Sequence, residues 1–243
     1  MKTIWTLTMK ELRSFFDSLI AYIILALFLG LSGIFTWLPV ADSDIFFHKQ
    51  ATLRGFFSIS YWTLFFFIPA ITMRMIAEEK KTGTIELLLT KSISDRQLVL
   101  GKFLASFILI ALALFFTFPY VITLAKLGNL DNGGTICGYL GLLLMSGVYI
   151  SIGLYASSIT SNQIVAFLLS LITGLFFHMI FGFLGHNIPG AGGELFSYLS
   201  LTNHFESISR GVIDTKDLVY FFSLIFLGLF LTEGSISKRK TAG

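Results

Sequence analysis

The segment Glu78–Lys102, EEKKTGTIELLLTKSISDRQLVLGK, carries nine charged residues and lies between long apolar blocks. The chain as a whole is 55% hydrophobic and only 13% charged, whereas soluble domains carry about 25% charged residues. On either side of the segment at least 19 consecutive residues lack charge, which is the length of a transmembrane helix. The sequence therefore predicts an all-α membrane protein in which 78–101 is an aqueous loop.

Uncharged blocks predict six transmembrane helices. Residues 132–193 contain no Asp, Glu, Lys or Arg, and these 62 residues are too many for one span. The polar run Ser157–Gln163 divides them in two. Pro69 is expected to kink the second span. The predicted spans lie at about 19–38, 55–76, 103–124, 136–156, 164–184 and 217–237.

Residues 3–17, before the first span, predict an amphipathic helix. Its apolar side chains recur at steps of four and three and so share one helical face; they are Trp5, Met9, Leu12, Phe16 and Leu19. Such a helix fits the membrane interface. An extension of the first span is the alternative.

Basic residues predict the orientation. With the N-terminus inside, the inner segments hold twelve Lys and Arg residues and the outer segments hold five, which favours a cytoplasmic N-terminus, C-terminus and 78–101 loop. The outer segment 185–216 is broken by glycines, and its apolar residues indicate short re-entrant helices; an ordinary exposed loop is the alternative. Within it, Asn203-x-x-Glu206 and Asp214-x-x-Asp217 are typical of helix N-caps.

The loop contains two helix-start patterns. Gly83-Thr84, with Glu86 in the following turn, predicts a short helix. Ser94-x-x-Gln97 predicts a capping box that leads into the third span. Mixed charge beside a small apolar patch favours docking to another protein. A solvated face without a partner is the alternative.

Three motifs follow one another in the loop: Glu79-Lys80-x-x-Gly83-Thr84-Ile85-Glu86-Leu87-Leu88, Ser94-x-x-Gln97 and Gly101-Lys102. Together they resemble the cytoplasmic loop of ABC-2 type transporter permeases. The six spans, the amphipathic N-terminal helix and the broken outer segment also resemble that family. Three stretches are similar to its gliding-motility permease subfamily (GldF): WTLTMKELRSFF at 5–16, FFFIPAITMRMIAEEKKTGTIELLLT at 65–90 and HFESISRGVIDTKDLVYF at 204–221.

The resemblance implies a multi-pass membrane subunit of an ATP-driven exporter in a bacterial inner membrane. In the family, a coupling helix in this loop sits in a cleft of a cytoplasmic ATPase subunit, and a pair of these subunits binds ATP and Mg. The ATPase-coupling residues carried over are Glu79, Gly83, Thr84, Glu86, Leu87 and Leu88, while Gly101 and Lys102 would close the loop. A second permease copy or a related membrane subunit is also implied. Force transmission to periplasmic partners without bulk transport is the alternative within this class.

The chain itself is not expected to hydrolyse ATP. Gly101-Lys102 is not part of a Walker A loop, because position 96 is Arg and position 103 is Phe where Gly and then Ser or Thr are required. The usual metal-binding and acyl-transfer motifs are absent from the sequence, so no metal or cofactor is expected on this chain. The formal charge of +3 does not indicate nucleic acid. A membrane-embedded lipid-modifying enzyme is the alternative from a different class.

Ion-coupled transport is the rival mechanism, and it requires ionisable groups inside the membrane. The interiors of the predicted spans hold no Asp, Glu, Lys or Arg, and His178 is the one candidate. A neutral histidine bonded to a neighbouring helix is expected there rather than a proton relay. Small residues along the fourth span predict close helix packing within the subunit, with a dimer seam as the alternative; they include Gly141, Gly147, Gly153 and Ser157.

Overall fold

The computed structural model describes residues 2–38, 52–84 and 93–242, and within these ranges the chain is helical with no strand. This confirms the predicted all-α class. The helices in chain order are α1 (Lys2–Asp17), α2 (Leu19–Trp37), α4 (Arg54–Thr72), α5 (Ala77–Lys81), α7 (Asp95–Phe115), α8 (Phe118–Leu127), α9 (Asn132–Ile159), α10 (Gln163–Leu175), the π-helical turn η1 (Phe176–Ile180), α11 (Phe181–Asn187), α12 (Ala191–Leu199), α13 (Leu201–Ser209) and α14 (Thr215–Ala242).

Six helical units are long and apolar enough to cross a membrane, as predicted: Leu19–Trp37, Arg54–Lys81, Asp95–Leu127, Asn132–Ile159, Gln163–Asn187 and Thr215–Lys238. The second and third units extend further into the 78–101 loop than predicted, because the residues at both of its ends are themselves helical. Much of this segment therefore continues the spans. Residues 85–92 lie outside the described chain.

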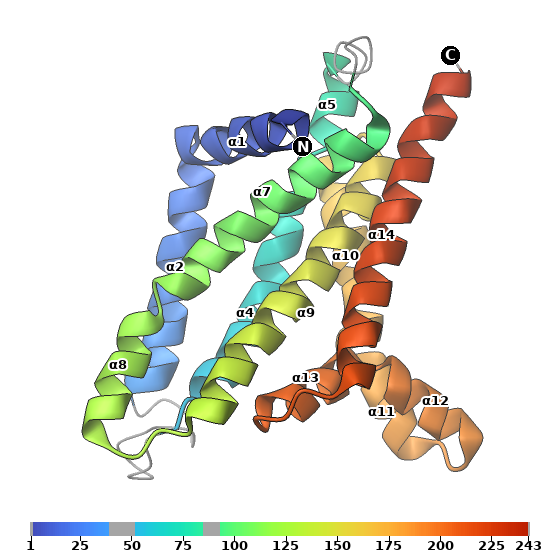
Figure 1. Cartoon of the computed structure of the whole chain (residues 1–243). Helices are drawn as coiled ribbons and strands as arrows, with labels where there is room; N and C mark the ends of the chain where they lie inside the picture. Colours follow the sequence, from blue (N-terminus) through green and yellow to red (C-terminus); the bar gives the residue numbers. More distant parts are fainter. Residues whose placement is uncertain (1, 39–51, 85–92, 243) are drawn as a thin grey trace.

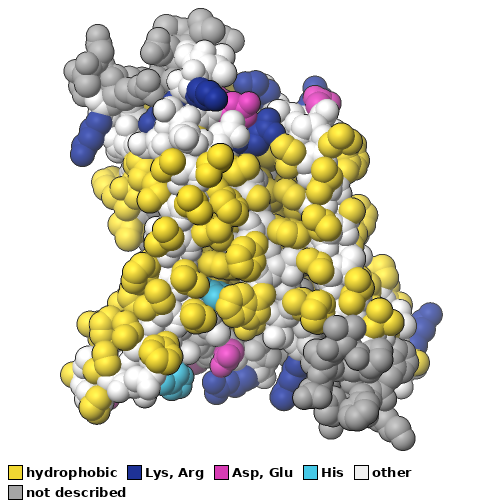
Figure 2. Space-filling model, turned by 180° about the vertical axis from the view of Figure 1, so that it is seen from behind, with side chains coloured by type: hydrophobic (Ala, Val, Ile, Leu, Met, Phe, Trp, Pro, Cys, Tyr) yellow, Lys and Arg dark blue, Asp and Glu magenta, His cyan; other side chains and the backbone are white. Residues whose placement is uncertain are grey.

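Charged and apolar side chains separate along the length of the molecule. Figure 2 shows hydrophobic side chains over its middle, with Lys, Arg, Asp and Glu gathered toward the two ends. Large apolar side chains such as Leu27, Phe226 and Phe230 are at least half exposed. An apolar surface this extensive is unusual for a protein in water, so the belt fits contact with lipid chains.

Both termini and α5 lie at one end of the bundle, and α8, α12 and α13 lie at the other (Figure 1). Helix α1 lies crosswise to α2 at the first end (Figure 1) and corresponds to the predicted amphipathic helix. The apolar stripe read from the sequence is only partly free, because Trp5 is 55% exposed whereas Leu12 and Phe16 are half-buried and pack against the core. The buried apolar side chains on this helix are Leu7 and Phe15, and Glu11 lies between them on the same face. The exposed part of the stripe fits the membrane interface.

Helix α9 is the centre of the bundle and packs against α4, α7, α10, α13 and α14. Its glycines make this possible. A Cβ atom at Gly147 would lie 2.8 Å from Ile225 of α14, and one at Gly153 would overlap Thr72 of α4. The predicted close packing of the fourth span within the subunit is therefore confirmed at these positions.

The helix breaks differ from those expected. Helix α4 continues through Pro69 to Thr72 and then gives way to a turn before α5. The third span breaks between α7 and α8, just before Pro119, which stands in the first turn of α8 and fits there because it needs no backbone hydrogen-bond partner. Helix α9 extends to Ile159, so Ser157 is a buried helical residue and not part of a polar connection.

The outer segment contains two short helices in the described chain, α12 and α13, but its predicted caps were partly wrong. Ser200 caps α13 by accepting a hydrogen bond from the Asn203 backbone, so Asn203 lies inside the helix and not at its start. Its side chain instead donates to the Ser197 carbonyl oxygen at 3.0 Å. Asp214 does precede α14, while Asp217 is fully buried in the first turn of that helix.

Candidate functional site

The predicted coupling residue Glu79 and the predicted loop-closing residue Lys102 lie in contact where α1, α5 and α7 meet, at the end of the bundle that holds both termini (Figure 1). The start of α7 is fixed locally. Ser94 accepts a hydrogen bond from the Gln97 backbone, and the Gln97 side chain accepts one from the Ser94 backbone, which confirms the predicted capping box. Seven residues into α7, Lys102 points back toward α5.

Lys102 is the centre of a buried ion cluster. Its Nζ lies 2.7 Å from Oε1 of Glu79 on α5 and 3.2 Å from Oε1 of Glu11 on α1. The Lys102 side chain is 1% exposed, and those of Glu11 and Glu79 are 14% and 17% exposed. One ammonium group therefore joins three helices whose residues lie up to 91 positions apart in sequence.

The cluster is stable only as a unit. A buried ammonium without a partner loses its hydration and gains nothing in return. Two carboxylates around one ammonium leave an excess negative charge, and Glu79 Oε2 is buried without a hydrogen-bond partner in the described chain. Any movement of α5 that separates Glu79 from Lys102 would expose or isolate these charges, so the cluster favours joint movement of α1, α5 and α7.

Gly101 lets α1 approach α7 closely. A Cβ atom there would lie 2.8 Å from Leu7 Cβ, and Thr8 Oγ1 donates a hydrogen bond to the Gly101 carbonyl oxygen at 3.3 Å. Gly101 and Lys102 thus lie inside helix α7, where they bind α1 and α5. Because Glu79 and Lys102 lie at opposite ends of the Glu78–Lys102 segment, their ion pair joins these two ends.

Helix α5 is also fastened to α9, through Ser157. The Ser157 hydroxyl accepts hydrogen bonds from the backbone N–H groups of Ile76 (3.1 Å) and Ala77 (2.9 Å) and donates to the Met73 carbonyl oxygen (2.9 Å). These backbone groups are freed by the break between α4 and α5, and an α-helix would otherwise satisfy them. A second link runs from the Lys80 Nζ to the Ser158 carbonyl oxygen.

The predicted short helix after Gly83 can be followed only at its beginning. Gly83 has a φ of +71° and comes directly after α5 and its C-cap residue Thr82, a position where helices commonly end on glycine. It therefore ends α5, while Thr84 directly after it is helical again, which agrees with the predicted helix start. Thr84 lies 2.9 Å from Thr82, hydroxyl to hydroxyl. Glu86, Leu87 and Leu88 lie outside the described residues.

A cavity of about 300 Å³ opens beside the ion cluster. Side chains of α1, the turn after α4, and α5 line it, including Lys10, Arg74 and Glu78. Arg74 and Glu78 form an ion pair at 3.1 Å. The surface around α5 thus carries both signs of charge, which is typical of docking surfaces that recognise a protein partner.

Residues 44–233 match the family model of ABC-2 family transporter proteins. The match covers 190 of the 243 residues. The chain belongs to this family. An ABC-2 family chain is the membrane-embedded subunit of an ABC transporter and not its nucleotide-hydrolysing subunit. No curated protein shows significant similarity to the chain.

Helix α1 precedes the matched part of this ABC-2 chain, and sequence reasoning missed its main contribution to the site, Glu11. The sequence did contain a pattern that indicates this role of Glu11. Leu7, Glu11 and Phe15 recur at steps of four and share a helical face, so a single carboxylate interrupts an otherwise buried surface. A charge in such a position indicates a partner on the neighbouring helix.

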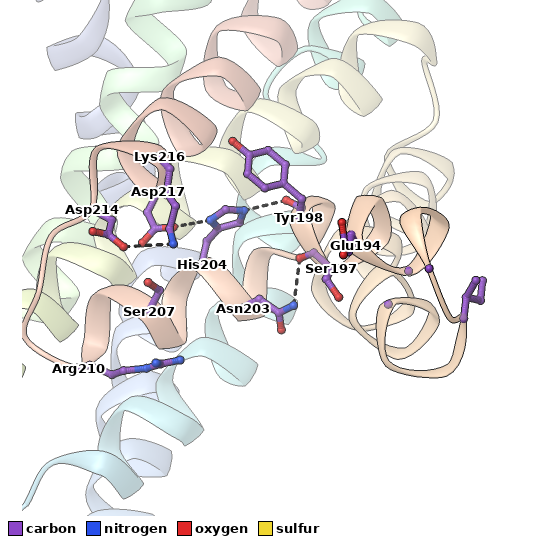
Figure 3. A pocket seen from close by; sticks show the side chains of 14 residues that line it. Glu194, Ser197, Tyr198, Asn203, His204, Ser207, Arg210, Asp214, Lys216 and Asp217 are labelled. Carbon is purple, nitrogen blue, oxygen red and sulfur yellow. Dashed lines mark hydrogen bonds and ion pairs between the residues drawn. The ribbon is translucent and has the colours of Figure 1, made fainter.

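A second polar cluster lies at the opposite end (Figure 3). His204 of α13 has Nδ1 2.6 Å from Asp217 Oδ1 and Nε2 2.8 Å from the Tyr198 carbonyl oxygen. Its ring stacks on Tyr220 at 3.9 Å between centroids. The Tyr198 carbonyl oxygen can only accept a hydrogen bond, so Nε2 donates to it, while Nδ1 contacts the carboxylate. The pair fixes α12 and α13 to α14.

His178 in η1 is buried in the middle of the fifth span, and its Nδ1 lies 2.6 Å from the Tyr149 hydroxyl of α9. Phe65 stacks on the imidazole at 5.0 Å and Trp62 meets it edge-on at 4.5 Å. This is the predicted contact with a neighbouring helix. The only polar partner of the ring in the described chain is the tyrosine hydroxyl, so these contacts form no chain of proton carriers.

Proposed function

We propose that this chain is the permease subunit of an ATP-driven export complex and that α5, with residues 82–92 after it, docks on a separate cytoplasmic ATPase subunit. The observation that carries the proposal is the Lys102 cluster, because it ties the proposed docking element to both α1 and α7. Family membership supports an ABC partner. The charge distribution supports the orientation, since twelve of the 17 Lys and Arg residues belong to the segments at this end.

ATP and Mg would bind only on the partner, and closure of a pair of ATPase subunits would push α5 sideways. Through Lys102 the push reaches α1 and α7, and through Ser157 it reaches α9. The export pathway forms against a second copy of this chain or a related membrane subunit in a bacterial inner membrane. We assign the complex to gliding motility. The basis is the sequence similarity of three stretches to gliding-motility permeases, at residues 5–16, 65–90 and 204–221.

The test is co-purification of the chain with its ATPase from the native membrane, comparing Glu86→Arg with a matched charge reversal, Glu194→Arg, in the exposed part of α12. Reversing a charge at the docking surface costs several kcal/mol, so Glu86→Arg is expected to reduce the bound ATPase about tenfold or more. Glu194→Arg is expected to retain it. Equal ATPase recovery and turnover in the two variants would refute the docking assignment.

A further inference from the structure

A cavity of about 950 Å³ opens at the end of the bundle opposite α5. Three parts of the chain line it: the first two turns of α4, the connection from α8 to α9, and α13. Its volume falls within the range of about 300–1,000 Å³ that small-molecule sites occupy. Neither the ion cluster at Lys102 nor the coupling role accounts for this cavity.

The inner wall of the cavity is aromatic. Phe57 and Tyr61 lie one turn apart on α4, and Phe205 of α13 completes the wall, with its ring 5.7 Å from that of Tyr61. Phe57 and Phe205 are 7% and 3% exposed, so both are held by packing and present a fixed apolar surface. Such a surface suits an alkyl chain or a ring.

Charged groups stand at the mouth of the cavity. Arg54 is in the first turn of α4 and Arg210 follows the last turn of α13, and both line the cavity. Neither forms an ion pair with the described part of the chain. Figure 3 shows Arg210 lying apart from the His204–Asp217 pair. A positive charge in the first turn of a helix is unfavourable, so an anion beside Arg54 would also relieve the N-terminus of α4.

The two carboxylates at the mouth differ in how they are used. Asp131 caps α9, because its Oδ1 accepts a hydrogen bond from the Gly134 backbone at 3.0 Å. Glu206 is exposed and forms no ion pair with the described residues. The mouth therefore presents two guanidinium groups, whose planar donors match phosphate and carboxylate, beside two carboxylates, of which Asp131 is held by the start of α9 and Glu206 is exposed.

We propose that this cavity binds an amphipathic anion, with its phosphate or carboxylate at Arg54 and Arg210 and its apolar part against Phe57, Tyr61 and Phe205. A lipid headgroup and a soluble amphipathic anion share this chemistry. Binding at this site does not require the ATPase. The identification of the bound molecule as the exported substrate rests on the proposed function.

The experiment measures binding of dodecyl phosphate to the full chain in phosphatidylcholine nanodiscs, with empty nanodiscs as the reference for partition. The variants are Arg54→Gln/Arg210→Gln, Glu206→Gln and Lys126→Gln, the last being an exposed cation of α8 outside the cavity. A charge-assisted hydrogen bond contributes about 1.5–3 kcal/mol, so the double arginine variant is expected to bind at least about tenfold more weakly. Lys126→Gln is expected to bind like the wild type.

Glu206→Gln provides a test that a folding defect cannot imitate, because binding of dodecyl phosphate is expected to tighten two- to threefold, about 0.4–0.7 kcal/mol. Competition by phosphatidylglycerol in the disc would identify a lipid source, and competition only by soluble hexyl phosphate would identify a soluble one. Unchanged binding in the double arginine variant overturns the proposal. Binding of inorganic phosphate as tight as that of dodecyl phosphate would also overturn the proposal. The Glu86→Arg variant is expected to bind normally, so ligand binding and ATPase docking can fail independently.

Discussion

Replacing Lys102 with methionine tests whether α1, α5 and α7 are held together by one buried cation. Methionine keeps most of the side-chain volume and removes the charge. The two carboxylates that remain are mostly buried, at 14% and 17% exposure, and lose the cation that pairs with both of them. Removing one partner of a buried ion pair costs about 3–5 kcal/mol. For a chain of this size we expect the unfolding temperature in mild detergent to fall by about 6–20 °C.

The cause can be isolated by combining Lys102→Met with Glu79→Gln. If the loss comes from stranded negative charge, neutralising Glu79 in the Lys102→Met background should restore part of the stability, with a coupling energy of about 0.5–3 kcal/mol. Glu78→Gln is the matched control, because the Glu78 side chain pairs with Arg74 and not with Lys102. Denaturant titration of the four proteins in each cycle measures both couplings. Additive effects of Glu79→Gln and Lys102→Met would refute the cluster as the link between the helices.

Three further substitutions test separate contacts by the same titration. Gly101→Ala should destabilise the chain by about 1–3 kcal/mol through overpacking against α1, whereas Gly30→Ala, with no neighbour within 4 Å of the added carbon, should be neutral or stabilising; equal effects would contradict the close approach. Ser157→Ala should cost about 1–3 kcal/mol for each of two orphaned backbone N–H groups, and far more than Ser146→Ala, which removes only a bond within its own helix. Tyr149→Phe should cost about 1–3 kcal/mol by leaving the buried imidazole unpaired, and an unchanged unfolding midpoint would show that the hydroxyl contact is not made.

The spans and the capping box at Ser94 were predictable because each depends on local sequence. Apolar length alone determines whether a helix can cross a bilayer, and a capping box requires only residues three apart. The predicted cap at Asn203 was wrong because Ser200, three residues earlier, is also a favoured N-cap residue and begins the helix instead. At Gly83 the pattern indicated the helical residue that follows, Thr84, but not the end of α5 before it, because that end depends on a positive φ that the sequence does not show.

The contacts that make the site were harder to predict because they join distant parts of the chain. The resemblance placed Glu79 and Lys102 in two motifs of one loop, but their contact and the participation of Glu11 depend on how α1, α5 and α7 pack. Ser157 was read as part of a polar break between two spans. Its burial shows the opposite role, because it satisfies backbone groups freed by a break in a different span. Three-dimensional packing, not local pattern, decided these cases.

Helix α5 is anchored on two sides, at Lys102 through Glu79 and at α9 through Ser157 and Ser158. A rigid rod pinned at two points retains one easy movement, rotation about the line that joins them. A sideways force on the chain just after Lys81 would therefore rotate α5. Through the two anchors this rotation would exert a torque on α7 and α9 together, with α5 as the lever arm. The positions of the two anchor points, and not the length of the helix, set the axis of that rotation.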